Sequence, residues 1–143
     1  MAEKTIRRIG IVACSKAKLT TEARARDLYQ GRLFRLSRAV VEAQCDDWCI
    51  LSAGYGVVLP SQILAPYDIT LNWMSAEQRR EWADDAYASL VERFGRNVLY
   101  VVYAGKPYRA ALEGLKFEVP LEGLGIGRQM QRLKRILEEG EAL

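Results

Sequence analysis

The stretch Ile9-Gly10-Ile11-Val12-Ala13-Cys14-Ser15-Lys16 decides the fold, because it changes abruptly from apolar to polar. Its first five residues form an unbroken apolar run, which is typical of a strand buried on both faces of a sheet. We expect this strand to span residues 5–13. A polar loop over residues 14–19 follows at its carboxyl end and leads into a helical region. The chain therefore starts as strand, loop and helix, which is the pattern of an α/β protein.

Three further apolar runs repeat this pattern along the chain. We expect them to form strands at residues 48–53, 97–104 and 117–121. Strands that alternate with helices are joined by crossovers, which makes the strands parallel and places helices on both faces of the sheet. The sequence therefore predicts a single three-layer α/β/α domain over residues 1–143, with a mainly parallel central sheet of about four strands.

Helical periodicity fills the segments between and after these strands. Helices are expected at about residues 21–44, where Gly31 would divide the region, at residues 75–94 and from about residue 125 to Gly140. The second opens with a capping box, Ser75 at the N-cap and Gln78 three residues later, and stops at Gly95. The expected buried faces are, in chain order, Tyr29, Leu33, Leu36 and Val40; Trp82, Ala86, Leu90 and Phe94; and Ile126, Met130, Leu133 and Leu137.

Composition excludes several function classes. Of the 143 residues, 50% are hydrophobic and 27% charged, which is typical of a globular domain rather than a disordered chain. No apolar run reaches the roughly 18 residues that a membrane-spanning helix needs. Residues 1–4 do not begin a secretory signal, so we expect a cytoplasmic protein with no membrane partner. Histidine is absent, which excludes a Ser-His-Asp triad, a Cys-His dyad and a His-containing zinc site.

The three cysteines, Cys14, Cys45 and Cys49, point to a reducing compartment. An odd number of cysteines without a secretory signal argues against a disulfide framework. Cys45 and Cys49 lack the spacing of a zinc knuckle and have no second pair, so they are expected to be small apolar residues near a strand. The sequence therefore calls for no metal and no cofactor.

Charge is distributed unevenly along the chain. Residues 1–38 carry ten basic and three acidic side chains, whereas the remainder carries 11 basic and 15 acidic ones. A basic N-terminal third favours an anionic partner, a nucleotide or a nucleic acid. A solvated helix face is the alternative, and the sequence does not decide between the two.

Three loops are expected to meet at the carboxyl ends of the strands and to share one pocket, because ligands of open α/β sheets bind at that edge. They are residues 14–19, 52–70 and 104–108. In the first loop, Ser15, Lys16 and Lys18 could hold a phosphate, and Cys14 would form part of the wall. Lys106 would add a cation from the third loop. A plain polar connection between strand and helix is the alternative for each loop.

The second loop carries the candidate catalytic residues. Gly54 and its neighbouring glycine allow a sharp turn that would present Tyr55 to a base, beside Ser52. Asp68 is the carboxylate best placed to assist N-glycosidic cleavage by stabilising oxocarbenium character and orienting water. The alternatives are a structural turn for Tyr55 and a cap or an ion pair for Asp68.

The glycines of Gly123-Leu124-Gly125-Ile126-Gly127 open the last helix. Glycines at a helix N-terminus permit close approach of a phosphate. Tight packing of the helix on the sheet is the alternative. The segment is not a dinucleotide-binding fingerprint, since no strand–helix–strand unit follows it.

Taken together, these segments resemble a bacterial and phage family of unknown function. The matching motifs are Cys14-Ser15-Lys16-Ala17-Lys18-Leu19, Leu28-Tyr29-Gln30-Gly31-Arg32-Leu33-Phe34, residues 50–56, residues 66–71 and the late glycine segment. That family is more distantly similar to the uracil-DNA-glycosylase-like superfamily, which includes the core domain of archaeosine-synthesis enzymes. The resemblance implies a three-layer α/β/α domain that acts on a nucleobase or its glycosidic bond. The superfamily's acidic water-activating residue and late histidine have no counterpart here.

The leading hypothesis is therefore a nucleobase- or nucleotide-directed enzyme, a glycosidase or base-exchange enzyme. In it Lys16 and Lys18 would hold phosphate, Tyr55 would face the base and Asp68 would act at the sugar. One alternative is a non-catalytic module that binds nucleotides or nucleic acid through the same pocket. Another is a structural subunit of a defence or modification complex. The sequence does not set the oligomeric state.

Overall fold

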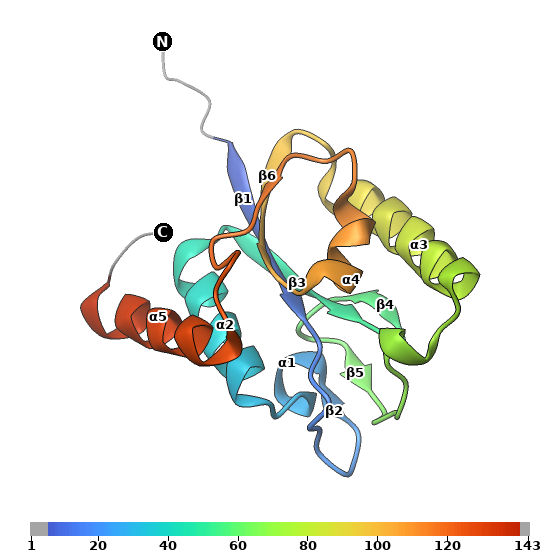
Figure 1. Cartoon of the computed structure of the whole chain (residues 1–143), viewed down its shortest axis with the longest axis horizontal. Helices are drawn as coiled ribbons and strands as arrows, with labels where there is room; N and C mark the ends of the chain where they lie inside the picture. Colours follow the sequence, from blue (N-terminus) through green and yellow to red (C-terminus); the bar gives the residue numbers. More distant parts are fainter. Residues whose placement is uncertain (1–5, 141–143) are drawn as a thin grey trace.

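A five-stranded sheet with the order β4-β3-β1-β6-β7 forms the centre of the computed structural model, which describes residues 6–140 (Figure 1). Four strands run parallel: β1 (Arg7–Ala13), β3 (Asp47–Ser52), β6 (Val98–Tyr103) and β7 (Phe117–Glu118). The predicted α/β class and the four neighbouring parallel strands are confirmed. A fifth strand, β4 (Gly56–Val58), pairs antiparallel with β3 and lies in the segment predicted as a loop.

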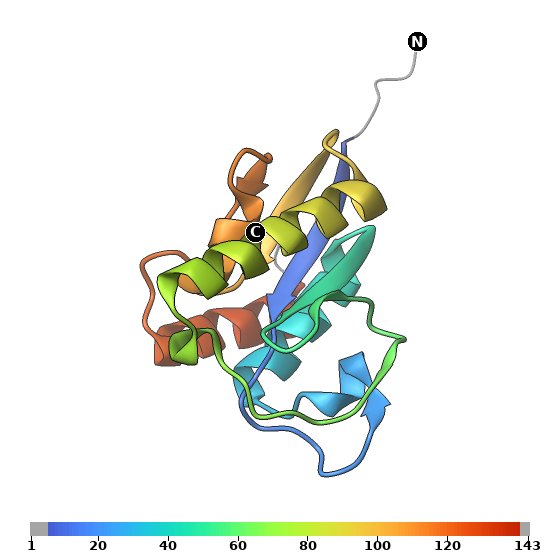
Figure 2. The same ribbon diagram turned by 90° about the vertical axis from the view of Figure 1, so that its right-hand side faces the viewer.

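Helices cover both faces of this sheet (Figures 1 and 2). On one face lie α2 (Arg32–Gln44) and α5 (Ile126–Glu139), which pack against each other. On the other face lies α3 (Ala76–Phe94), beside the short α4 (Lys106–Arg109) and the 3-10 turn η2 (Ala110–Leu112). Each face therefore has its own hydrophobic core, as the three-layer prediction requires.

The alternation of side chains along β1 explains why this strand is apolar throughout. Ile9 and Ile11 are fully buried in the core under α3, whereas Val12 is buried in the core under α2. Gly10 points toward α2, and a Cβ at this position would lie 2.6 Å from Cβ of Val41. The absence of a side chain at Gly10 thus lets α2 pack directly on the central strand.

The predicted helix over residues 21–44 is wrong for its first third. That third forms β2 (Ala23–Arg24), which pairs with β5 (Ile63–Leu64), and the one-turn helix α1 (Ala25–Leu28). Tyr29 is not helical but extended, and it bridges Lys18. The break lies at Gly31, the N-cap of α2. The extended backbone lets the Tyr29 side chain reach hydroxyl partners on β3 and in the next loop.

The other two helices agree with prediction to different degrees. In α3 the capping box is present, the predicted face is buried, and the helix ends at Gly95 with φ of +83°. In α5 the predicted face is only partly right, because Leu133 and Ile136 are the buried residues. Ile126 is 65% exposed and Leu137 is also exposed. The first turn of α5 borders an open cavity, which leaves Ile126 without a packing surface.

Candidate functional site

A cavity of about 630 Å³ opens between the carboxyl ends of β1 and β6. The chain leaves β1 toward β3 on one side and later returns to β6 on the other, so this edge is the topological switch point of the sheet. We refer to this space as the switch-point cavity. Its walls come from the loops after β1 and β6, from the first turns of α2 and α5, and from the segment between β7 and α5.

Two helices begin at the switch-point cavity. Gly31 is the N-cap of α2 and Gly125 is the N-cap of α5, and neither helix has a side-chain cap or an acidic residue in its first turn. The first N–H groups of a helix lack partners within it and carry a partial positive charge. Because Arg32, Leu33 and Ile126 line the cavity, both helix N-termini border it. This arrangement suits an anion.

Charged and amide side chains add to this positive character. Arg32 and Arg109 both line the cavity. Arg109 is mostly buried and pairs with Glu122, 3.3 Å between Nη1 and Oε1. Gln129 donates from Nε2 to the backbone oxygen of Leu124 at 2.7 Å, which fixes the loop that opens α5. The cavity wall thus holds two guanidinium groups and one carboxylate.

The inner wall of the cavity is mostly apolar. Phe34 and Tyr103 supply aromatic surface, and both are nearly buried. Ser37 of α2 also lines the cavity, is 2% exposed, and makes no hydrogen bond through its side chain to any residue within 6–140. A buried hydroxyl without a partner costs free energy, so a ligand or water that reached it would be favoured.

Three hydroxyl groups outside the lining of the cavity, those of Tyr29, Ser52 and Tyr67, form a hydrogen-bonded cluster that we call the hydroxyl triangle. The Tyr29 hydroxyl lies 3.0 Å from Ser52 Oγ and 2.9 Å from the Tyr67 hydroxyl, and Ser52 Oγ lies 2.7 Å from the Tyr67 hydroxyl. Burial raises the pKa of Tyr29 to about 12 and raises the pKa of Tyr67 further. Both phenols therefore remain neutral at physiological pH.

Cys14 connects the switch-point cavity to the α3 side of the sheet. Its thiol lines the cavity, lies 3.4 Å from the Tyr108 hydroxyl and accepts from the Ala53 N–H at 3.4 Å. Burial, together with the neighbouring thiol, raises the pKa of Tyr108. Cys14 thus lies in the wall of the cavity.

The predicted phosphate-binding loops divide between the cavity and the surface. Ser15 lines the cavity, donates to the Ala17 carbonyl at 2.8 Å and accepts from the Gly31 N–H at 3.1 Å. Lys16 and Lys106 are exposed and do not line the cavity. Lys18 lies over the Tyr67 ring, with Nζ 4.4 Å from its centroid. Of the three loops expected to share one pocket, those after β1 and β6 line the cavity. Residues 52–70 contribute none of its lining residues, so the expectation that all three loops share it is not met.

The candidate residues of the second loop gather around Tyr67. The Tyr55 ring packs edge-on against it at 5.3 Å, and the Tyr55 hydroxyl donates to the Ala65 carbonyl at 2.9 Å. A Cβ at Gly54 would lie 2.8 Å from this ring, so the glycine permits the close approach. Ser52 is fully buried in the hydroxyl triangle. Asp68 is exposed and has no hydrogen bond or ion pair with the residues that the structure describes.

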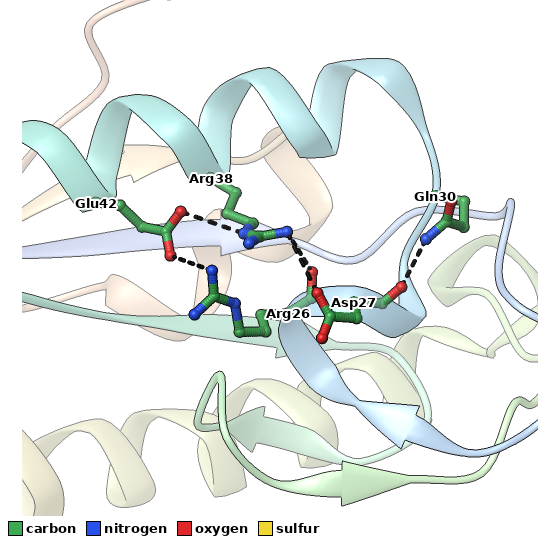
Figure 3. Close-up of polar contacts among 5 residues, drawn as sticks. All are labelled: Arg26, Asp27, Gln30, Arg38 and Glu42. Carbon is green, nitrogen blue, oxygen red and sulfur yellow. Dashed lines mark hydrogen bonds and ion pairs between the residues drawn. The ribbon is translucent and has the colours of Figure 1, made fainter.

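The basic N-terminal third is partly neutralised by ion pairs (Figure 3). Arg26 pairs with Glu42 at 3.2 Å, and Arg38 pairs with both Glu42 at 3.2 Å and Asp27 at 3.6 Å. These contacts join α1 to α2.

Sequence reasoning missed the cavity side chains Arg32, Ser37, Arg109, Glu122 and Gln129. Two of them had a detectable signal. Arg32 directly follows Gly31, which marks a helix start, and Glu122 directly precedes the glycine segment that opens α5. No sequence signal of this kind lies beside Ser37 or Arg109, because only the packing of α2 and α4 directs these two residues to the cavity.

Neither a metal cluster nor a membrane span is found within residues 6–140. No three Cys, Asp or Glu side chains in that range gather as metal ligands would. None of its helices combines the length and apolarity needed to cross a bilayer.

A protein-family model matches most of the chain. Residues 9–135 match the sequence model of a family described as a family of unknown function, DUF6884. The match covers most of β1 and most of α5, and it includes every residue that lines the switch-point cavity. No curated protein matches the chain.

Proposed function

The chain belongs to DUF6884, a family of unknown function, and from its switch-point cavity we propose that it is a nucleotide-directed domain. The observation that carries this proposal is that two helices without side-chain caps, α2 and α5, start at one cavity that also holds Arg32 and Arg109. Phosphate is the anion that best matches this combination, because helix N–H groups and guanidinium groups both bind its oxygens.

The apolar inner wall supports a base rather than a bare phosphate. Phe34 and Tyr103 offer aromatic surface on which a base could stack, and Ser37 offers a hydroxyl that could bind the edge of the base. A cavity of about 630 Å³ has room for one nucleotide. The resemblance of the motifs to the uracil-DNA-glycosylase-like superfamily also supports a nucleobase. Free thiols at Cys14, Cys45 and Cys49 support a cytoplasmic setting.

Cleavage or exchange at an N-glycosidic bond is the second candidate function. It is favoured by the carboxylate of Glu122 in the cavity wall, beside Arg109. A carboxylate near the sugar could stabilise oxocarbenium character in the transition state. Asp68 and Tyr55 remain candidates for this step, on the loop beside the cavity. Since Asp68 is exposed and unpaired, we rank binding above catalysis.

The test is a binding screen of nucleoside mono-, di- and triphosphates by thermal melting, followed by calorimetry on the hits. A ligand at about 100 times its Kd should stabilise the fold by about 2.7 kcal/mol, a shift of roughly 5–10 °C in Tm. Arg32→Gln should weaken a hit by about 10- to 100-fold, because a charge-assisted hydrogen bond is lost. Arg93→Gln on α3, also exposed, is the matched control and should leave Kd unchanged.

The catalytic candidate is tested on the nucleotide that the screen identifies, by release of free base. Glu122→Gln and Asp68→Asn retain shape and remove charge. The variant that lowers turnover by about 100-fold or more with a similar Kd contains the working carboxylate. Binding without base release in the wild type would leave the binding module as the function. The absence of any stabilising nucleotide would overturn the proposal as a whole.

A further inference from the structure

We propose that the outer face of α5 is a docking surface for single-stranded nucleic acid, one nucleotide of which occupies the switch-point cavity. This inference rests on the proposed function and adds to it the choice of a polymer over a free nucleotide. Three observations support this inference: a groove beside α5, the positive charge of that groove, and its continuity with the switch-point cavity.

The groove runs along α5, with a volume of about 550 Å³. We call it the α5 groove, and its walls are Leu124, Arg128, Gln131, Arg132, Lys134, Arg135 and Glu138. Four cationic side chains thus line it against one carboxylate. From Arg128 to Arg135 the cations extend over about 10 Å of helix axis, at a rise of about 1.5 Å per residue. A row of cations of this kind matches the regular negative charge of a phosphodiester backbone.

Three cations of the α5 groove, Arg128, Lys134 and Arg135, remain available to phosphates. Arg128 and Lys134 are exposed and make no ion pair with residues 6–140. Arg135 pairs with Glu139 at 3.7 Å, but both side chains are more than half exposed. Such surface pairs contribute about 0–1 kcal/mol, so a phosphate could replace the carboxylate at little cost.

The α5 groove and the switch-point cavity meet at Leu124, which lines both. Helix α5 therefore borders the cavity with its first turn and the groove with its outer face. Between Leu124 and Arg135 the lining of the groove contains no carboxylate, and the lining of the cavity contains one, Glu122. Glu122 is already paired with Arg109.

The cavity also favours a single strand over a duplex. Its aromatic wall at Phe34 and Tyr103 lies at the base of the site, nearly buried. A base within a duplex is stacked and paired, and it would have to leave the stack to reach that wall. A base in a single strand has no such cost, and stacking on aromatic side chains is the usual mode of binding single strands.

The experiment measures binding of a fluorescein-labelled 15-nucleotide single strand of mixed sequence by anisotropy at several salt concentrations. The same sequence as a duplex, and the mononucleotide found in the melting screen, are measured in parallel. The test variant is Arg128→Gln/Lys134→Gln/Arg135→Gln. The matched control, Arg79→Gln/Arg80→Gln/Arg93→Gln, removes three exposed charges from α3 on the opposite face of the sheet.

The wild type should bind the single strand more tightly than both the mononucleotide and the duplex. The α5 variant should lose about 50-fold at 0.15 M salt and should flatten the log–log salt slope by about 2, since each phosphate contact to a single strand contributes about 0.7. Its mononucleotide Kd should stay within about twofold of wild type, and the control should match wild type for all three ligands.

The failures can be told apart. If the wild type binds the mononucleotide but holds the single strand no more tightly, the docking surface is refuted and the proposed function stands. Equal affinity for the duplex, or an α5 variant that behaves like the α3 control, also overturns the inference. If the wild type binds neither mononucleotide nor single strand, the proposed function fails and the inference fails with it.

Discussion

Replacing Ser52 by alanine separates a structural from a ligand-binding role for this residue. Its hydroxyl is fully buried and contacts the hydroxyls of Tyr29 at 3.0 Å and Tyr67 at 2.7 Å. It also accepts from the Tyr55 N–H at 3.1 Å. Ser52→Ala removes all three contacts. Tyr29 and Tyr67 remain bonded to each other at 2.9 Å, so neither hydroxyl is left without a partner.

The expected loss of folding free energy follows from these three lost hydrogen bonds. Each lost hydrogen bond costs about 0.5–1.5 kcal/mol, and an abandoned buried donor costs more. The half-exposed Tyr55 segment can recover a bond to water, which lowers the total to about 2 kcal/mol. For a chain of this size the loss corresponds to a fall of roughly 4–8 °C in Tm.

Urea unfolding followed by tryptophan fluorescence measures this cost, with calorimetry for Tm. Ser61→Ala is the matched control, because Ser61 is exposed and its stability change should stay within about 0.5 kcal/mol. A double-mutant cycle with Tyr67→Phe should show a coupling of about 0.5 kcal/mol or more, since the two hydroxyls share one network. A Ser52→Ala protein as stable as the Ser61 control would refute the hydroxyl triangle as a structural element.

Other consequences concern packing and pH. Gly10→Ala should lower the free energy of unfolding in urea by about 1–3 kcal/mol, because the new methyl group would lie 2.6 Å from Cβ of Val41. A loss below about 0.5 kcal/mol would contradict the close packing of α2 on β1. Leu133→Ala should cost about 2–5 kcal/mol, whereas Leu137→Ala should cost under about 1, since only Leu133 is buried; equal losses would contradict the observed face of α5. Burial raises the pKa of Tyr29 to about 12, so the unfolded chain loses this proton first as pH rises above about 10. The contribution of Tyr29 to stability should therefore be constant up to about pH 9 and then fall by up to about 1.4 kcal/mol per pH unit. Tyr29→Phe should reduce the slope of stability against pH above about pH 10, and an unchanged slope in that variant would remove Tyr29 as a cause.

The sheet was predictable because its central strands are apolar on both faces. The run from Ile9 to Ala13 needs no partner to be recognised, and the same holds for β3 and β6. Strands β2 and β5 were not predictable, because each has two residues and pairs only with the other. Local sequence carries too little signal for isolated strands of that length. The equally short β7 was predicted only as part of the longer segment 117–121.

Tyr29 shows why the helical prediction failed at its start. Its spacing from Leu33, Leu36 and Val40 is helical, but its hydroxyl bonds to Ser52, 23 residues away, and to Tyr67, 38 residues away. Those bonds need an extended backbone at Tyr29, and a periodicity argument does not contain them. Tertiary contacts override local pattern here.

The location of the cavity at the carboxyl edge of the sheet could be predicted better than the side chains that line it. The strand order puts the Cys14-Ser15 loop and the glycine segment before α5 at one edge, and both line the cavity. Charge alone did not identify the cations that line the cavity, because Lys16 and Arg32 are both basic residues near the start of a helical segment. The start of α2 at Gly31 places Arg32 in the wall of the cavity, whereas Lys16 does not line it.

The most direct test of nucleotide binding at the switch point is a titration of ¹⁵N-labelled protein with the nucleotide found in the screen, followed by amide chemical shifts. We expect the largest changes at the first-turn amides of α2, from Arg32 to Phe34, and of α5, at Ile126 and Gly127, because these N–H groups would bind the phosphate. Changes that leave these amides untouched and gather instead around Tyr55 and Asp68 would contradict binding at the switch-point cavity.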